Sequence, residues 1–425
     1  MCAPEITGYP LVMSLLQVLV AGQHASGVRA SGGLVWALLQ AQSLHVADLA
    51  RALPDLRARG ARQAMRRVRR HLGGAALSSA VLSPLVIQAA LRLAEPGAVT
   101  LILDSTRCRS WEIFTLGGRL GGRVLPVAWS VLPYPWPRNQ FTPTVVALIT
   151  RTLSSWPPSR SVHLVADRGF PSRALFCCLE EWRDRRNLGY TIRLRASDYV
   201  RDAASQAHKV ADLMTQRPAT GWGQWPVSYQ RRRPSAPGAT LVIGQEEIAP
   251  PPHQRGPADT RRRAARAARR AAHLRSKSQP AAAQTDRLWA LLSTHPTAAA
   301  AAGAYAGRFA TEGTYRDYKE WDLAAVAAHE TSASHLDGLL GVAALAYLLQ
   351  GAIGLGAGRA HHDAARARQD QWSTTDRLSV FWRGRHVLHD HAFDWLPWLG
   401  SCLSQLQTTL HQDHDYSPLS RSEAA

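Results

Sequence analysis

Short apolar runs rich in β-branched residues begin near residue 97 and alternate with helical patterns, which restricts the middle of the chain to a mixed α/β fold. The first run, Val99–Leu103, ends at Asp104, and a later run, Val162–Val165, ends at Asp167. A glycine-rich turn at 117–122 is predicted between two further strands. The other predicted elements are the strands Trp111–Leu116, Val124–Leu132 and Gly189–Leu194, and the helices Thr144–Leu153, behind Pro143, and Pro171–Trp182, with proline in its first turn.

The order of these elements, β-β-β-α-β-α-β, is that of a ribonuclease-H-like sheet and predicts an α/β fold with such a catalytic core. A β-rich insertion with strands around Trp222–Tyr229 and Thr240–Ile243 interrupts the core, which resumes with the strand Leu288–Leu292 and one long helix over Ala298–His329. The predicted segments are a helical, basic DNA-binding region (1–95), the first part of the core (96–196), the β-rich and basic insertion (197–285), the remainder of the core (286–335) and a C-terminal helical region with a possible dimer contact (336–425).

The charge favours a polyanionic partner. The 425 residues include 50 Lys and Arg against 31 Asp and Glu, a formal net charge of +19, so nucleic acid is the first expectation and an anionic membrane surface the second. Arg59, Arg62, Arg66 and Arg70 recur at helical spacing along one face with no acid among them. We interpret this face as a DNA contact, with a solvated charged surface as the alternative.

Cysteine usage and hydropathy indicate the compartment. The five cysteines are odd in number and contain no CxxC pair, which argues against a disulfide framework or a cysteine zinc site and favours a reducing cytoplasm, in association with the nucleoid. The longest apolar stretch, Leu339–Leu349, is too short to cross a bilayer and is expected to form a buried helix. No membrane partner is therefore expected.

Acidic residues supply the chemistry. Asp104 and Asp167 lie at or just after strand ends, where open α/β sheets carry their active sites. On one helix, Tyr305, Arg308, Glu312 and Lys319 would all face the same way. Three carboxylates in one place need a cation, and oxygen ligands suit Mg²⁺.

These residues resemble a known family, the DDE transposases of bacterial insertion sequences, specifically the insertion-sequence-four group with its YREK signature. Tyr305, Arg308, Glu312 and Lys319 fit every spacing of that signature, and Asp104 and Asp167 lie in sequences similar to the two strand-end motifs. Gly313 and Thr314 depart mildly from the group's pattern, which more often has an apolar or aromatic residue after the glutamate.

The resemblance implies cut-and-paste transposition through a hairpin on the transposon end. Asp104, Asp167 and Glu312 would be catalytic and hold two Mg²⁺ ions, for which Mn²⁺ can substitute. Tyr305, Arg308 and Lys319 would contact DNA near the cut, and a tryptophan of the insertion would stack on an extruded base, with Trp222 and Trp225 as candidates by region and ordinary packing as their alternative. The partners would be the terminal inverted repeats, target DNA and a second copy of the chain in the synaptic complex.

Two alternatives remain at this point. A catalytically inactive, transposase-derived DNA-binding protein would retain the basic surfaces without metal-dependent cleavage. A ribonuclease-H-like nuclease without strand transfer would share the acids, although the β-rich insertion and the arginine-rich helix argue against it.

Overall fold

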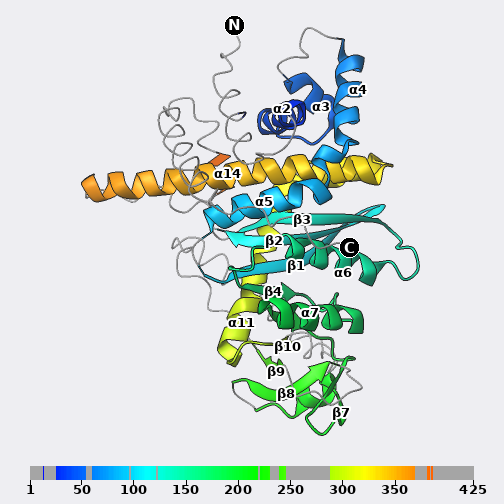
Figure 1. The fold of residues 1–425 in the computed structure, drawn as a ribbon, viewed down its shortest axis with the longest axis vertical. Helices are drawn as coiled ribbons and strands as arrows, with labels where there is room; N and C mark the ends of the chain where they lie inside the picture. The colour runs from blue at the N-terminus through cyan, green and yellow to red at the C-terminus, as the bar shows by residue number, and fades with distance from the viewer. Residues whose placement is uncertain are drawn as a thin grey trace, which may run out of the picture. The chain divides into compact units, whose positions relative to one another are not determined.

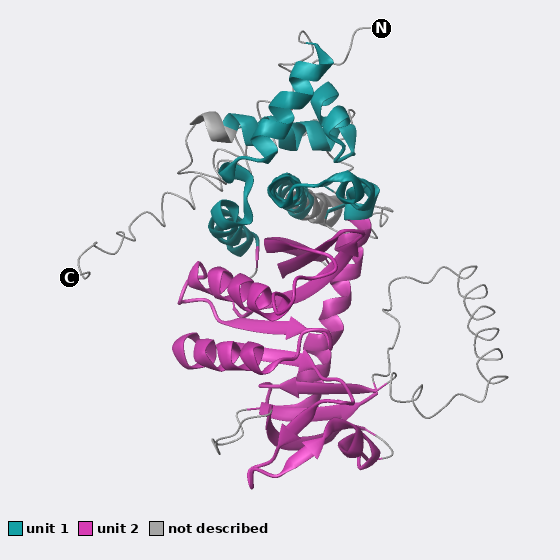
Figure 2. Ribbon diagram, turned by 90° about the vertical axis from the view of Figure 1, so that its right-hand side faces the viewer, with its two compact units in different colours: residues 1–93, 318–425 teal, residues 94–317 magenta. Residues whose placement is uncertain are grey.

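The computed structural model describes residue 13 and residues 25–53, 60–94, 97–120, 123–218, 221–229, 239–245, 288–368, 381–382 and 384–385. These residues divide into two compact units, one formed by 94–317 and the other by 1–93 together with 318–425 (Figure 2). Of the predicted insertion 197–285, residues 219–220, 230–238 and 246–285 lie outside the described residues, as do the chain beyond 385 and Arg59.

A mixed sheet of ten strands forms the frame of the 94–317 unit, within a mixed α/β architecture (Figure 1). Its strand order is β3-β2-β1-β4-β5-β10-β9-β8-β6-β7. β1 pairs in parallel with β4, and β4 with β5, whereas β1–β2, β2–β3, β5–β10, β10–β9, β9–β8, β8–β6 and β6–β7 are antiparallel. The strands are β1 (Val99–Cys108), β2 (Trp111–Leu120), β3 (Arg123–Pro133), β4 (Val162–Ala166), β5 (Gly189–Arg193), β6 (Tyr199–Arg201), β7 (Ala207–Lys209), β8 (Gly223–Tyr229), β9 (Ala239–Gly244) and β10 (Trp289–Ser293).

The predicted core strands are all present, but the glycine-rich turn is placed wrongly in part. Gly117 and Gly118 lie inside β2, at a register shift against β3 between Leu116 and Gly117. A Cβ on Gly117 would come within 2.8 Å of the Leu125 carbonyl oxygen, closer than such atoms approach. Gly117 therefore serves the close approach of two strands rather than a chain reversal.

Helices cover both faces of this sheet. α6 (Phe141–Ser154) and α7 (Arg173–Arg186) lie side by side on one face, and α11 (Ala298–Ala306) packs on the other (Figures 1 and 2). α7 begins after Pro171, not with it in the first turn, because the Ser172 hydroxyl caps the helix by accepting the Leu175 amide at 3.2 Å. The short helix α8 (Val210–Thr215) follows β7.

The long helix expected over Ala298–His329 is wrong as one element. α11 passes into a 3₁₀ turn, η3 (Gly307–Phe309), then into α12 (Ala310–Glu320), and α13 (Leu323–His329) follows Asp322 at φ 60°. A 3₁₀ turn winds more tightly than an α-helix, so it rotates the face of α12 relative to that of α11.

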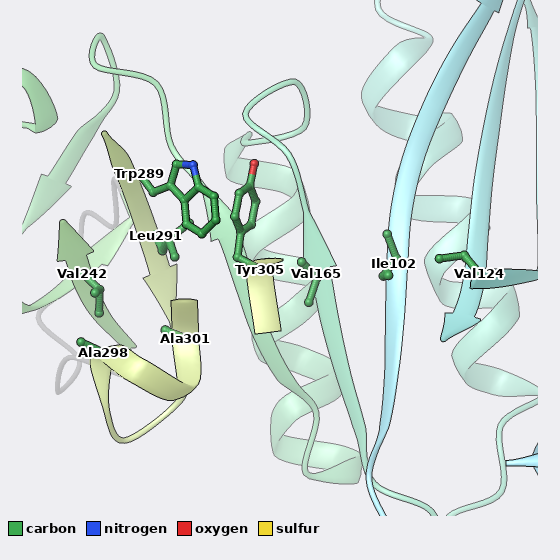
Figure 3. Packing of buried hydrophobic residues seen from close by; sticks show 9 residues of the cluster. All are labelled: Ile102, Val124, Val165, Val242, Trp289, Leu291, Ala298, Ala301 and Tyr305. Atoms are coloured by element: carbon green, nitrogen blue, oxygen red, sulfur yellow. The ribbon is translucent and has the colours of Figure 1, made fainter. Parts of the chain in front are cut away.

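The apolar core under α11 joins side chains from five strands. Ile102, Val124, Val165, Val242, Trp289 and Leu291 from the sheet pack with Ala298, Ala301 and Tyr305 from α11 (Figure 3). Tyr305 stands edge-on to Trp289, with ring centroids 4.8 Å apart, and its hydroxyl points away from the aliphatic side chains (Figure 3). Because side chains alternate along a strand, residues two positions after Ile102 and Val165 share this face.

The other unit is helical. It contains α2 (Ala25–Ala41), α3 (Val46–Ala52), α4 (Ala61–Leu72), η2 (Ala75–Leu77), α5 (Ser79–Leu93), α13 and α14 (Ala333–Arg368). Gly338 and Gly341 of α14 lie against the backbone oxygens of Leu72 and Leu77, where any Cβ would overlap. The two glycines thus permit the close contact of α14 with α4 and η2.

Two segments of this unit, Ala75–Leu93 and Ala333–Leu355, are long and apolar enough to cross a membrane by length and composition alone. The apolar stretch Leu339–Leu349 was expected to be too short to cross a bilayer. That expectation is wrong about length, because the stretch belongs to the longer apolar segment Ala333–Leu355. The expectation that it is buried is confirmed, since 89% of the apolar window of Ala333–Leu355 lies inside the protein.

His163 makes the stability of the sheet dependent on pH. It lies buried on β4, bonded through Nε2 to the Thr191 hydroxyl at 2.8 Å and stacked on His295 at 3.9 Å. Burial first, and the neighbouring His295 second, lower the pKa of His163 to about 3, while burial also lowers that of His295.

Between this pKa and the ordinary value near 6.5, the unfolded chain binds more protons than the folded one, so the contribution of His163 is fully present above about pH 6.5 and is lost as the pH falls toward 3. We expect the wild type to lose about 2 kcal/mol of unfolding free energy from this group between pH 7 and pH 5. His163→Gln, which keeps a hydrogen-bonding partner for Thr191, should show a shallower slope in denaturant titrations over that range. An unchanged slope would contradict the assignment.

Candidate active site

Asp104 and Asp167 are brought together by the parallel pairing of β1 with β4. Ile102 pairs with Val165 and Leu103 with Ala166, so continuing this register places Asp104 beside Asp167. Since Ile102 and Val165 both face α11, the two carboxylates lie on that face. Asp167 directly follows β4, but the prediction that Asp104 ends its strand is wrong, because β1 continues to Cys108 in its pairing with β2. The two predicted acids nevertheless form a pair.

Arg308 bridges this pair. Its Nη1 lies 3.1 Å from Asp104 Oδ2 and its Nη2 lies 3.7 Å from Asp167 Oδ2. The side chain of Arg308 is only 11% exposed, so the interaction is poorly screened by solvent. Among the described residues, this guanidinium is the cation that contacts both carboxylates.

Tyr305 holds the second aspartate from the same segment. Its hydroxyl donates to Asp167 Oδ1 at 2.7 Å. Burial, followed by the charge of Asp167, raises the pKa of Tyr305 to about 12, so the phenol remains a hydrogen-bond donor throughout the neutral range. Two members of the YREK pattern thus converge on Asp167.

The two aspartates differ in their affinity for a proton. Burial raises the pKa of Asp104 to about 6, against the opposing effects of the Arg308 guanidinium and the Ser105 amide. Burial acts in the same direction on Asp167, but Arg308 and the Tyr305 hydroxyl outweigh it and hold that pKa below its ordinary value. The site therefore favours the ionised form of Asp167 and disfavours the ionised form of Asp104.

Glu312 lies in the first turn of α12 and is exposed. Its negative charge contributes to the raised pKa of Asp104, which indicates that it is near this carboxylate. Even so, no three His, Cys, Asp or Glu side chains of the described residues are grouped closely enough to hold a metal ion. The structure thus brings together the two aspartates and leaves the third carboxylate outside their direct contact.

α12 is anchored to β3 directly beside Glu312. The Thr314 hydroxyl donates to the Val124 carbonyl at 2.9 Å and accepts the Val124 amide at 3.1 Å. A Cβ on Gly313 would lie 2.8 Å from Nε of Arg123, which pairs with Asp317 at 3.2 Å. Gly313 and Thr314, the mild departures from the family pattern, therefore have a packing explanation.

Lys319 is an exposed residue in the last turn of α12 and belongs to the other compact unit. The tryptophans proposed for base stacking are both partly buried. Trp222 packs against the core cluster and over Gly244, and Trp225 lies over Gly223, the first residue of β8. Their stacking role stays a prediction, with packing as the interaction that the structure displays.

Two arginines near Asp167 were not among the sequence candidates. Arg193 Nη1, at the end of β5, lies 4.0 Å from Asp167 Oδ1. Arg195 binds the carbonyls of Arg168 and Gly169 at 2.7 and 3.2 Å and so braces the loop that follows Asp167. A sequence signal existed, since Arg193 lies near the end of the predicted strand Gly189–Leu194, but its contact with Asp167 depends on the β4–β5 register.

The arginine-rich helix is present as α4. Its arginines at 62, 66, 67, 69 and 70 are exposed, while Ala64, Val68 and Leu72 are buried on the opposite side. Within the described part of the chain, none of these arginines forms an ion pair. The face is therefore a cationic surface that no carboxylate among the described residues pairs with.

Comparisons with protein-family models, curated proteins and solved structures find no match for this chain.

The bridging contact of Arg308 generates a stability prediction. Arg308→Gln leaves two adjacent, partly buried carboxylates without their shared cation, and we expect the unfolding free energy to fall by about 3 kcal/mol at pH 7.5. Arg51→Gln, which removes the exposed pair with Asp48, is the matched control and should change it by less than about 0.5 kcal/mol. Equal changes in the unfolding free energy for the two substitutions would show that the Arg308 bridge stabilises the fold no more than an exposed ion pair does.

Proposed function

We propose that this chain is a DDE transposase that cleaves DNA at transposon ends and joins the freed ends to target DNA. The observation that carries the proposal is the convergence of Tyr305 and Arg308 on Asp104 and Asp167. These residues come from motifs that are more than 130 positions apart in the sequence. A surface salt-bridge stripe on a helix would not require that convergence.

The sheet supports the same proposal. The order β3-β2-β1-β4-β5, with β1, β4 and β5 parallel and β2 antiparallel, corresponds to the arrangement expected of a ribonuclease-H-like core. The strands of the predicted insertion, β8 and β9, extend this sheet through β10 instead of forming a separate body. The proposed core would thus place its chemistry within β1, at Asp104, and at the carboxyl end of β4.

The donor set fits divalent cations in chemistry, because it offers carboxylate oxygens whose combined charge exceeds that of Arg308. Asp104, Asp167 and Glu312 would hold Mg²⁺, with Mn²⁺ as a substitute. When bound, two such ions would activate the attacking oxygen and stabilise the leaving oxygen at phosphorus.

The chain's own residues prepare the site for a phosphate substrate. Tyr305 fixes the orientation of Asp167 and favours its ionised form by donating a hydrogen bond to it. Arg308 partly offsets the charge of the carboxylate pair in the absence of substrate, and its guanidinium would have to leave them before they could bind a cation. Once released, it is placed to bind a phosphate oxygen beside the cut, the role expected of it in the signature.

DNA binding would rest on surfaces outside this site. The exposed arginines of α4, among them Arg62, Arg66 and Arg70, offer phosphate contacts without a carboxylate competitor. Lys319 would add a contact near the cut. Two copies of the chain, each holding one terminal repeat, would form the synaptic complex.

Glu312 gives the direct test of catalysis. Labelled duplexes that carry both ends of the element flanking this gene are incubated with wild type in Mg²⁺, Mn²⁺ or EDTA. We expect metal-dependent nicks or hairpins at the ends, and Glu312→Gln should reduce their rate at least about 100-fold while leaving end binding intact.

Glu320→Gln is the matched control. Glu320 lies on the same helix as Glu312, and its ion-pair partner is Arg385, at a distance of 2.8 Å. Cleavage by Glu312→Gln at the wild-type rate would remove this residue from the site. Binding without cleavage in either metal would instead favour the catalytically inactive DNA-binding alternative.

Arg66 tests the proposed DNA surface. If Arg66 contacts phosphate, Arg66→Ala should weaken binding similarly for all sequences and reduce the slope of log K against log salt by about 1. Arg51→Ala, which removes an exposed arginine already paired with Asp48, should leave the slope unchanged. Identical slopes for wild type and Arg66→Ala in salt titrations would exclude this contact.

A further inference from the structure

An exposed group of aromatic and cationic side chains lies beyond Asp104 at the end of the β1–β2 hairpin. Arg107 lies 3.7 Å over the ring of Tyr134, and Trp136 stands edge-on to Tyr134 with ring centroids 5.6 Å apart. Trp136 is 39% exposed, one of the few large apolar side chains at the surface of the described residues. We call Arg107, Tyr134 and Trp136 the hairpin-tip platform.

A backbone hydrogen bond and two ring contacts support the platform. The Tyr134 amide donates to the Ser110 carbonyl at 2.7 Å, which ties the segment after β3 to the tip of the hairpin. Phe141 of α6 supports the Trp136 ring at 4.8 Å and in turn contacts Phe170 at 6.0 Å. Phe170 is tied by its amide to the Asp167 carbonyl at 3.1 Å. A chain of aromatic contacts therefore leads from the loop of Asp167 to the exposed indole.

The surroundings of the platform are cationic. Arg109 and Arg138 are exposed near it, and residues 105–111 and 133–140 contain no acid. Glu112 is the carboxylate beside Arg107, but it is buried and also accepts the Ser105 hydroxyl at 2.7 Å. Arg107 keeps half of its side chain exposed, so its outer guanidinium nitrogens remain accessible to a ligand.

A flat exposed indole among arginines has the chemistry that binds single-stranded nucleic acid. Bases stack on the aromatic face, whatever their sequence, and the cations bind the backbone phosphates. A single exposed apolar side chain needs no explanation by itself, but the arginines and the supporting aromatic rings distinguish Trp136 from that case.

The platform is a surface separate from the carboxylate pair. Arg107 follows Asp104 by three residues on the same strand, about 10 Å away along β1. Because side chains alternate along a strand, Arg107 lies with Ser105 and Glu112 on the face of the sheet opposite Asp104. Duplex DNA, whose bases are stacked on each other, would have no free base face to offer the indole.

We propose that the hairpin-tip platform binds unpaired nucleotides of single-stranded DNA, with Trp136 stacking on a base and Arg107 binding a phosphate. The inference goes beyond the proposed function, because its chemistry requires only a single-stranded nucleic acid. It differs from the expected role of Trp222 and Trp225, which lie in the insertion and are partly buried.

The test uses the full chain and an oligothymidylate of about 12 nucleotides that carries one 2-aminopurine, in EDTA so that cleavage plays no part. Stacking on an indole should quench the 2-aminopurine emission on binding. We expect Trp136→Ala to abolish most of this quenching and to raise the dissociation constant roughly tenfold, with Trp136→Phe restoring much of the affinity. A blunt duplex should bind Trp136→Ala as it binds the wild type.

Tyr199→Ala is the matched control, because Tyr199 is an aromatic residue of β6 with 47% exposure, in the same unit but at the far side of the sheet order. Wild-type quenching and affinity in Trp136→Ala, or an equal loss in Tyr199→Ala, would overturn the proposal. Loss of quenching in Trp136→Ala together with absent metal-dependent cleavage in the wild type would retain the platform and reject the transposase. Metal-dependent cleavage by the wild type, together with unaltered single-strand binding by Trp136→Ala, would retain the transposase and reject the platform.

Discussion

Two aspartates side by side, one within β1 and one directly after the parallel strand β4, repel each other, and the rest of the site has to offset this repulsion. The pairing of Val99–Leu103 with Val162–Ala166 fixes the backbone that carries Asp104 and Asp167. Arg308 and Tyr305 offset the repulsion from one short segment, since residues three positions apart lie on the same side of a helix. The β1–β4 register and this segment together determine the geometry of the site.

This arrangement separates the roles of the two carboxylates. Asp167 is surrounded by the Tyr305 hydroxyl and the guanidinium groups of Arg308 and Arg193, which favour its charged form, whereas Asp104 depends chiefly on Arg308. A cation that displaced Arg308 would therefore compete most directly for Asp104. In this view Arg308 partly offsets the carboxylate charge in the resting site, and a bound cation would replace it.

The elements that could be predicted from sequence are those whose pattern is local. The strands that became β1 and β4 contain continuous apolar runs, but the acid after the first run does not end its strand, because the pairing with β2 extends β1 to Cys108. The predictions failed where contacts distant in sequence determine the local structure. Gly117 lies in a strand because the β3 backbone approaches it closely. The common face of Tyr305 and Glu312 was predicted for an unbroken helix, whereas a 3₁₀ turn interrupts that helix. Helical spacing correctly grouped Tyr305 with Arg308, but it could not reveal that their partners are Asp167 and Asp104.

The net charge by itself did not distinguish among the arginines, and the structure separates them by what already binds them. Arg308 is engaged by carboxylates, and Arg195 by backbone carbonyls that hold the Asp167 loop in place. Binding a phosphate with either would first require breaking those contacts. Arg66 and its neighbours on α4 are exposed, and Arg107 is only partly engaged, by a buried glutamate. Because exchanging water for phosphate costs less than breaking a buried ion pair, under the proposed function an encounter with DNA would begin on these exposed arginines, and Arg308 would engage only after the substrate has reached the carboxylates.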